Sequence, residues 1–157
     1  MPRRATIQPR ALEPDPVYSS RLVTQVINKV MNDGKKSTAE AIVYQALDRV
    51  GEQTGKPPLE VLEQAVKTVT PVLETRSRRV GGANYQVPVE VSRKRQQSLA
   101  FRWILEIARG GRRGRPFSVA LAEEVVAAAR REGGAFTKRE NVHKMAEANK
   151  AFSHFAW

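Results

Sequence analysis

The chain of 157 residues has no cysteine, only two histidines and few aromatic residues (6%). Without cysteine it can form neither disulfides, nor a catalytic thiolate, nor a cysteine-ligated zinc site, which is typical of a reducing compartment. No apolar run approaches the roughly 20 residues that cross a bilayer, and the start MPRRATIQPR lacks the apolar core of a secretory signal. These absences predict a cytoplasmic protein that does not bind a membrane.

Motifs for catalysis and for cofactor binding are also missing. His143 and His154 are eleven residues apart, with no carboxylate at metal-ligand spacing, so we expect each to be exposed or hydrogen-bonded. Glu123 and Glu124 are adjacent and would point to different faces of a helix, which does not make an acid–base pair. The chain has no GxSxG motif, no Walker loop and no GxGxxG after a strand. We therefore expect a protein that is not an enzyme and binds neither a metal ion nor another cofactor.

Basic residues, in contrast, are abundant and unevenly distributed. The chain has 27 Lys and Arg against 16 Asp and Glu, a net charge of +11. Residues 76–115 hold eleven basic and two acidic residues, so nine of the eleven net charges fall in this quarter of the chain, and ten of its eleven basic residues are arginine. Guanidinium groups bind phosphate in bidentate fashion and stack on bases. This concentration predicts a surface that binds a polyanion.

Residues 72–91 are expected to form a β-hairpin that projects as an arm. Two β-type runs flank Gly81-Gly82, a pair that can adopt the positive φ of a two-residue turn. The register set by this turn places Pro88 opposite Thr75, at a non-hydrogen-bonded site. The sheet therefore loses no hydrogen bond through the missing N–H of Pro88. A two-stranded ribbon is marginally stable alone in water, so a partner for the arm is expected.

The distal part of the arm has the composition of an RNA-binding element. Its arginines are expected to have no acidic residue near them: Arg76, Arg78 and Arg79. The small residues Gly81 and Gly82 would let the backbone approach a nucleic acid closely, and Asn84 offers an amide to bases or 2′-hydroxyls. Tyr85 would stack either on Arg78, across the strand pair, or on a base.

A body of six helices is expected around this arm, three before it and three after it. The first expected helix begins after Ser19 or Ser20 and ends before the cap Gly34, and the second begins with a capping box at Ser37–Glu40 and is stopped by Gly51 and Gly55. The third begins at Pro57-Pro58 and ends at Pro71, and the fourth follows the N-cap Ser92 to about Arg109. The fifth runs from Pro116 to Gly133-Gly134, and the sixth begins with a capping box at Thr137–Glu140. The predicted fold is mainly α, in one domain that spans residues 1–157.

Three further basic segments belong to the expected binding surface. Residues 1–17 contain four prolines and are expected to form an extended tail. The tail with Arg3, Arg4 and Arg10 is either a disordered terminus or a basic arm that orders on a polyanion, and we favour the second interpretation. Residues 93–95 put three cations in a first helical turn, where the helix dipole disfavours them, so something other than the helix must favour them. Arg102 and Arg109 follow on the same general side. Residues 110–116, GGRRGRP, form a flexible cationic linker with Arg112, Arg113 and Arg115.

The type of partner is decided by the apex of the arm. Architectural DNA-binding proteins with basic β-arms commonly carry an apolar wedge there, such as proline, which unstacks a base step. The apex here is Gly-Gly-Ala-Asn, residues 81–84, and the only proline of the arm is in its stem. RNA is therefore favoured. An architectural DNA-binding protein and a protein-interaction adaptor remain the alternatives.

Several motifs resemble the family of bacterial ribosomal small-subunit protein seven. They are RSRRVGGANYQVPVEV at 76–91, DGKKS at 33–37, QQSLAFRW at 96–103 and KMAEANKAF at 144–152. The resemblance covers nearly the whole chain. It implies six helices with a β-ribbon between the third and fourth, binding to the 3′ major domain of small-subunit ribosomal RNA, and a role in nucleating assembly of the head. It also implies a ribbon near the transfer-RNA exit site and the messenger path, with the eleventh small-subunit protein as a neighbour. Many bacterial members repress translation of their own operon, so repression is an open possibility for this chain.

The resemblance also implies which residues contact RNA and where this chain differs from the family. The RNA surface carried over from the family is Arg3, Arg4, Arg10, Lys35, Lys36, Arg76, Arg78, Arg79, Arg93, Lys94, Arg95 and Arg102. After Val91 the family usually has a proline-bearing start, whereas this chain has Ser92 followed by Arg93-Lys94-Arg95. The usual ending Tyr-Arg-Trp is Phe-Ala-Trp at 155–157, which removes one cation from the tail.

Overall fold

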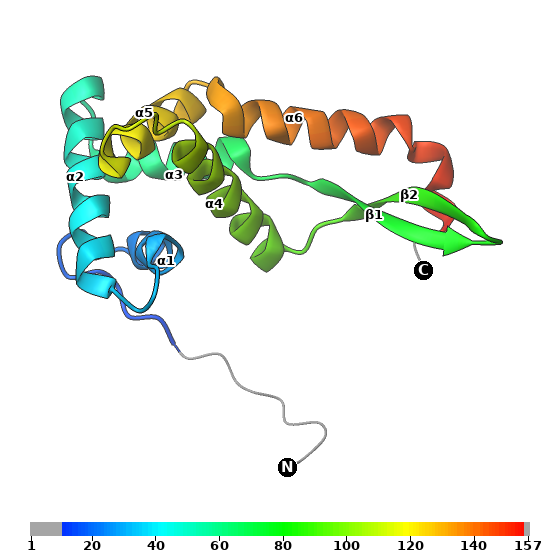
Figure 1. The fold of residues 1–157 in the computed structure, drawn as a ribbon, viewed down its shortest axis with the longest axis horizontal. Coiled ribbons are helices and arrows are strands. Elements are labelled where there is room, and N and C mark those ends of the chain that lie inside the picture. The colour runs from blue at the N-terminus through cyan, green and yellow to red at the C-terminus, as the bar shows by residue number, and fades with distance from the viewer. Residues whose placement is uncertain (1–10, 156–157) are drawn as a thin grey trace, which may run out of the picture.

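The computed structural model describes residues 11–155, which form six α-helices, one β-hairpin and a terminal 3-10 helix. The elements in chain order are α1 (Arg21–Val30), α2 (Lys36–Thr54), α3 (Pro58–Val69), β1 (Leu73–Val80), β2 (Ala83–Glu90), α4 (Arg93–Gly110), α5 (Phe117–Ala129), α6 (Gly133–Ala148) and η1 (Lys150–Phe155). Figure 1 shows α1 to α5 gathered at one end of the molecule and the hairpin projecting from them, with α6 beside it. The mainly α fold with a hairpin between α3 and α4 is confirmed.

The hydrophobic core joins the first five helices. Helix α5 packs against α2, α3 and α4, and its sequence FSVALAEEVVAAA is almost entirely apolar. Its alanines Ala122 and Ala128 are fully buried, so neighbouring helices can approach its backbone closely. Val23 and Ile27 of α1 and Val50 of α2 complete the centre of the core. This packed body is the base from which the arm projects.

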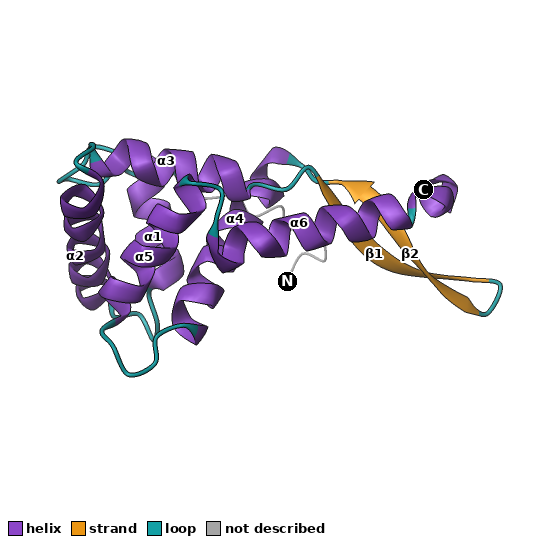
Figure 2. Cartoon of the chain, turned by 90° about the horizontal axis from the view of Figure 1, so that it is seen from above, coloured by secondary structure: helices purple, strands orange, loops and turns teal. Residues whose placement is uncertain are grey.

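The β-hairpin has the register expected from its turn. Thr75 pairs with Pro88, and Val80 pairs with Ala83 across the two-residue turn. Gly81 and Gly82 both have positive φ, +57° and +91°, as this turn requires. Figure 2, seen from above, shows the twisted ribbon extending beyond the helical body. The predicted arm is therefore confirmed in position and in pairing.

The first two helices differ at their ends from the expectation. Helix α1 ends at Val30, so Gly34, although its φ is +74°, lies in the following loop and does not cap the helix. Helix α2 begins at Lys36, and no side chain caps it. The expected capping box at Ser37–Glu40 is wrong because Ser37 is already inside the first turn. Glu40 instead lies 3.5 Å from the Lys36 ammonium as an i,i+4 ion pair.

The end of α2 shows why one of its glycines does not stop the helix. Gly51 lies inside α2, which continues to Thr54, and Gly55 provides the left-handed cap at φ +64°. A Cβ at position 51 would lie 3.2 Å from the Pro58 ring. Gly51 therefore allows α3 to begin close against α2, and the chain turns back at Gly55.

Helix α6 begins earlier than expected and is capped from another helix. It starts at Gly133, so the predicted capping box at Thr137–Glu140 is wrong, and the Thr137 hydroxyl donates to the Gly133 carbonyl within the helix instead (2.9 Å). The cap is Glu124 of α5, whose Oε1 accepts the Ala135 N–H at 2.8 Å. Residue order alone could not reveal a cap that lies eleven positions earlier in the chain.

Glu124 gives a first testable prediction. Burial raises the pKa of its carboxyl, and the hydrogen bonds from the Ala135 and Gly134 N–H groups oppose this rise only in part. We expect Glu124→Ala to lower the free energy of unfolding by about 1–2 kcal/mol, because the cap is lost. Glu124→Gln keeps an acceptor oxygen without the buried charge and should cost much less. Denaturant unfolding at pH 7 measures both variants, and equal losses would contradict the assignment of Glu124 as a cap.

The described part of the N-terminal segment is attached to the body. Asp15 is buried (4% exposed); its carboxylate accepts the N–H groups of Val17 and Tyr18 and, at 2.6 Å, the hydroxyl of Tyr44 on α2. That hydrogen bond is the main reason why the pKa of Tyr44 is raised, to about 12. Residues 11–15 have no helix or strand, as expected for the predicted tail. The expected RNA contacts Arg3, Arg4 and Arg10 lie outside the described residues.

Candidate nucleic-acid interface

The arm does not stand alone, because α6 supports one side of it. The Val72 N–H donates to Nε2 of His143 (3.1 Å), and the Thr75 hydroxyl contacts the Met145 sulfur at 3.3 Å. Burial lowers the pKa of His143, and the nearby Arg139 charge lowers it further, which favours the neutral imidazole that this bond requires. His143 is therefore hydrogen-bonded, as expected. The α6 contact supplies the support that a two-stranded ribbon needs.

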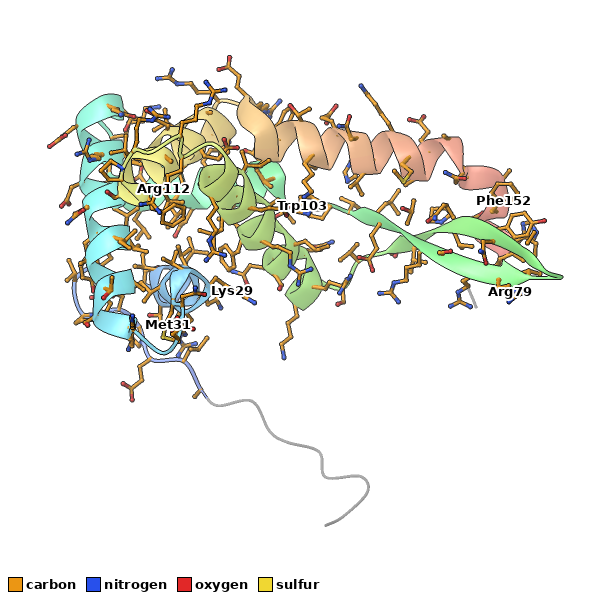
Figure 3. All side chains as sticks on the ribbon, in the orientation of Figure 1. Lys29, Met31, Arg79, Trp103, Arg112 and Phe152 are labelled. Atoms are coloured by element: carbon orange, nitrogen blue, oxygen red, sulfur yellow. The ribbon has the colours of Figure 1, made fainter. Side chains whose placement is uncertain are left out.

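The C-terminal 3-10 helix covers the outer part of β2. Tyr85 of the arm contacts Phe152 at 5.0 Å and Phe155 at 5.5 Å between ring centroids. Figure 3 shows Phe152 lying against the hairpin. Tyr85 is half-buried by this aromatic cluster, which was not expected because the sequence places the partners about 70 residues apart. All four residues of the apex, Gly81, Gly82, Ala83 and Asn84, are exposed.

A buried carboxylate joins the arm to α4. Glu74 is 8% exposed, and its oxygens lie 2.7 Å from Nη2 of Arg76 and 2.8 Å from Nε of Arg95. The expectation that Arg76 has no acidic residue near it is therefore wrong. Burial raises the pKa of the Glu74 carboxyl, but the hydrogen bonds and charges of Arg95 and Arg76 outweigh burial, so the net pKa lies below its usual value. Glu74 thus fixes two of the predicted RNA-binding arginines.

The first turn of α4 carries two cations that no acidic residue in the described part of the chain compensates. Helix α4 begins at Arg93 after Ser92, as predicted, although the Ser92 side chain makes no capping hydrogen bond. Arg93 and Lys94 are exposed, and neither makes an ion pair with any residue between 11 and 155. The free N–H groups and the dipole of a helix start also attract anions. This turn is therefore suited to bind phosphate.

A cationic groove between α1 and α4 adds a residue that the sequence analysis missed. Lys29, Arg102 and Arg109 line a groove of about 280 Å³, together with Glu106. The Arg109 guanidinium donates to the Val30 carbonyl of α1 (3.4 Å). Lys29 is a single cation in the last turn of α1, so no local pattern singled it out, and only helix packing brings it beside the two arginines.

The remaining predicted residues lie in two turns. In the α4–α5 turn, Nε of Arg112 donates to the Arg115 carbonyl (2.8 Å), and the Arg115 guanidinium pairs with Glu123 at 2.6 Å. The segment 110–116, expected to be a flexible linker, is thus a hydrogen-bonded turn in which Arg113 is exposed. In the α1–α2 turn, Lys35 is exposed and Lys36 pairs with Glu40.

The predicted residues form a long surface and not a single pocket. Figure 3 shows Arg79 on the arm, Lys29 beside α4 and Arg112 at the end of the body remote from the arm. In the described part of the chain, no group of three or more His, Asp or Glu side chains could hold a metal ion. None of the helices between residues 11 and 155 is both long and apolar enough to span a membrane. Dispersed cations of this kind suit an extended polyanion.

The chain is similar to known proteins along nearly its whole length. The family described as ribosomal protein S7p/S5e matches residues 2–150. The small ribosomal subunit protein uS7 of Carboxydothermus hydrogenoformans is 59% identical over all 157 residues of both chains, and the protein of the same name from Pelotomaculum thermopropionicum is 57% identical over the same length. That of Fervidobacterium nodosum is 54% identical over 155 residues, 99% of each chain.

Proposed function

Since the chain belongs to the ribosomal protein S7p/S5e family, we propose that it binds the 3′ major domain of small-subunit ribosomal RNA through its arm and α4. Membership makes it a protein of the small ribosomal subunit, a structural component of the ribosome and not an enzyme, and it implies association with ribosomal RNA. The observation that carries the finer proposal is the pair Arg93 and Lys94 at the start of α4, next to the root of the arm, which no acidic residue between 11 and 155 compensates.

In the proposed interface, different parts determine the affinity for RNA and the position of the arm on the RNA. Phosphate contacts supply most of the affinity, and the small apex of the arm approaches the RNA backbone closely. The proposed RNA-binding residues are Arg3, Arg4, Arg10, Lys29, Lys35, Lys36, Arg76, Arg78, Arg79, Gly81, Gly82, Asn84, Tyr85, Arg93, Lys94, Arg95, Arg102, Arg109, Arg112, Arg113 and Arg115. Within this set, Arg76 and Arg95 form ion pairs with Glu74, and Arg115 forms an ion pair with Glu123. We therefore expect these three arginines to contribute less to RNA affinity than the others.

The proposed role follows from one domain with a rigidly supported arm. The helical body binds the 3′ major domain early and nucleates assembly of the head. The arm then lies near the transfer-RNA exit site and the messenger path, where the eleventh small-subunit protein is its neighbour. The support for this placement is the contact of the arm with α6 and η1, which fixes its direction relative to the body. The proposed location is the ribosome in the cytoplasm.

Chemical footprinting on whole small-subunit ribosomal RNA tests the proposal. The expected result is protection confined to the 3′ major domain, and protection scattered over all domains would contradict it. An architectural DNA-binding protein is the second candidate, because basic β-arms on a helical body also occur in that class. Competition between the RNA domain and duplex DNA at one salt concentration separates the two, and we expect the RNA to be preferred.

A further inference from the structure

A second cationic groove lies between α3 and α6, on elements that the proposed interface does not use. Its volume is about 450 Å³, and its charged lining consists of Lys67 from α3 and of Arg131, Arg139 and Glu140 from the start of α6 and the turn before it. In Figure 1, α6 runs along the upper edge of the molecule, whereas the first turn of α4 points toward the lower edge. The groove is therefore separate from the Arg93 and Lys94 site.

The groove has more positive charge than its own acidic residue can compensate. Lys67 and Arg131 are exposed, and neither forms an ion pair within the described part of the chain. Glu140 contacts Arg139 only at 3.4 Å, which is long for a charge-assisted hydrogen bond. Two of the three cations are thus available to an anionic ligand.

Arg139 combines unused hydrogen-bonding capacity with an aromatic contact. Its guanidinium carbon lies 5.5 Å from the centroid of the Phe136 ring, which also lines the groove. Its Nε–H is buried and has no hydrogen-bond acceptor among residues 11–155. A buried donor without an acceptor is uncommon and calls for an explanation. An arginine stacked on an aromatic ring is also a platform on which nucleic-acid bases stack.

The backbone conformation of Arg131 gives independent evidence that its side chain has a function in this groove. Arg131 has φ +63° and follows the C-terminus of α5. The Glu132 N–H donates to the Ala127 carbonyl (2.9 Å) and the Arg131 N–H donates to the Ala128 carbonyl (3.1 Å). These two bonds form a helix-ending motif whose left-handed position is usually glycine, because other residues are strained there. Arginine at this position therefore makes the fold less stable than glycine would, and a function of the arginine side chain explains why it is there.

We propose that the α3–α6 groove binds the phosphate backbone of a second RNA segment. The inference rests on the proposed function, since it extends RNA binding to another face of the same chain. RNA fits better than an acidic protein segment because the groove offers both separated cations for phosphates and the Phe136–Arg139 platform for a base. Binding there would let one protein join two segments of the folded RNA.

The test uses the full-length chain and a transcript of the 3′ major domain. The variants are Lys67→Ala and Arg131→Gly, singly and together. The control is Arg49→Ala, which removes one exposed cation of α2 that has no ion-pair partner among the described residues and lies outside the groove. We expect the double variant to bind about 10-fold more weakly at about 0.15 M salt, with a log affinity against log salt slope less steep by about 2. Arg131→Gly should raise the melting temperature, which excludes misfolding as the cause.

The outcomes separate this inference from the proposed function. Wild-type affinity in the double variant, or the same loss per charge as in Arg49→Ala, would overturn the groove site alone. A wild-type chain without affinity for the transcript would overturn the proposed function as well. If the variants lose binding to polyglutamate but not to the transcript, the groove binds acidic protein, and the inference is wrong.

Discussion

Replacing Arg93 and Lys94 together by alanine is expected to weaken binding of the 3′ major domain RNA by about 10- to 100-fold at about 0.15 M salt. Both cations are exposed at the start of α4, and no described acidic residue compensates them. We do not expect the double substitution to destabilise the fold. Cations in a first helical turn oppose the helix dipole, so their removal should stabilise α4 by a few tenths of a kcal/mol for each charge.

The matched control removes two cations from the arm, in the variant Arg78→Ala with Arg79→Ala. We expect this pair to leave the helical body intact and to disturb mainly the placement of the arm, with a smaller loss of affinity for the isolated RNA domain. Circular dichroism checks helicity, and a filter-binding titration measures affinity for both pairs. Equal losses of affinity in the two double variants would contradict the division between affinity and placement.

The second large effect is expected at Glu74, where Glu74→Gln should loosen the arm without weakening RNA binding. The carboxylate holds Arg76 of the arm and Arg95 of α4 at 2.7 and 2.8 Å. We expect Glu74→Gln to lower the free energy of unfolding by about 1–3 kcal/mol. The value should be toward the lower end because both arginines are half-exposed and water screens their charges. Amide hydrogen exchange of β1 and β2 measures the loosening. RNA affinity should stay level or rise, because two guanidinium groups are released.

The pH dependence of this effect has a defined sign. Burial alone would raise the pKa of Glu74, but Arg95 and Arg76 together lower it below the ordinary value of 4.5. A carboxylate whose folded-state pKa is depressed stabilises the fold above its unfolded-state pKa. That contribution is then lost as the pH falls through the lower, folded-state value. The stability difference between wild type and Glu74→Gln should therefore be full at pH 7 and shrink below about pH 4.5. A difference that is constant from pH 7 to pH 3 would contradict the role of the charge.

Local signals predicted most of the fold, and they failed where a distant residue decides the structure. The arm and its register follow from Gly81-Gly82 and from the position of Pro88, all within one segment. The helices follow from apolar periodicity, but their ends do not. The start of α6 is set by Glu124 of α5, and a serine or threonine near a helix start is a weaker signal than a carboxylate supplied by packing.

The same distinction applies to the candidate interface. The sequence shows how many cations residues 76–115 contain, but it does not show which of them form ion pairs. Glu74 and Arg95 are 21 residues apart and meet only because the folded chain brings the root of the arm beside the start of α4. Lys29 enters the surface through the packing of α1 on α4. Tyr85 meets Phe152 because α6 runs beside the arm and η1, at its end, lies against β2.

The central claim is that this surface recognises folded ribosomal RNA and not negative charge in general. The most direct measurement is a salt series in which the full chain is titrated with the 3′ major domain transcript and with a shuffled transcript of the same length. If about eight phosphates are neutralised, log affinity should fall against log salt with a slope of about −6 to −7. The account predicts this slope together with a clear preference for the native transcript at every salt concentration. Equal affinity for both transcripts, or an affinity that does not depend on salt, would contradict it.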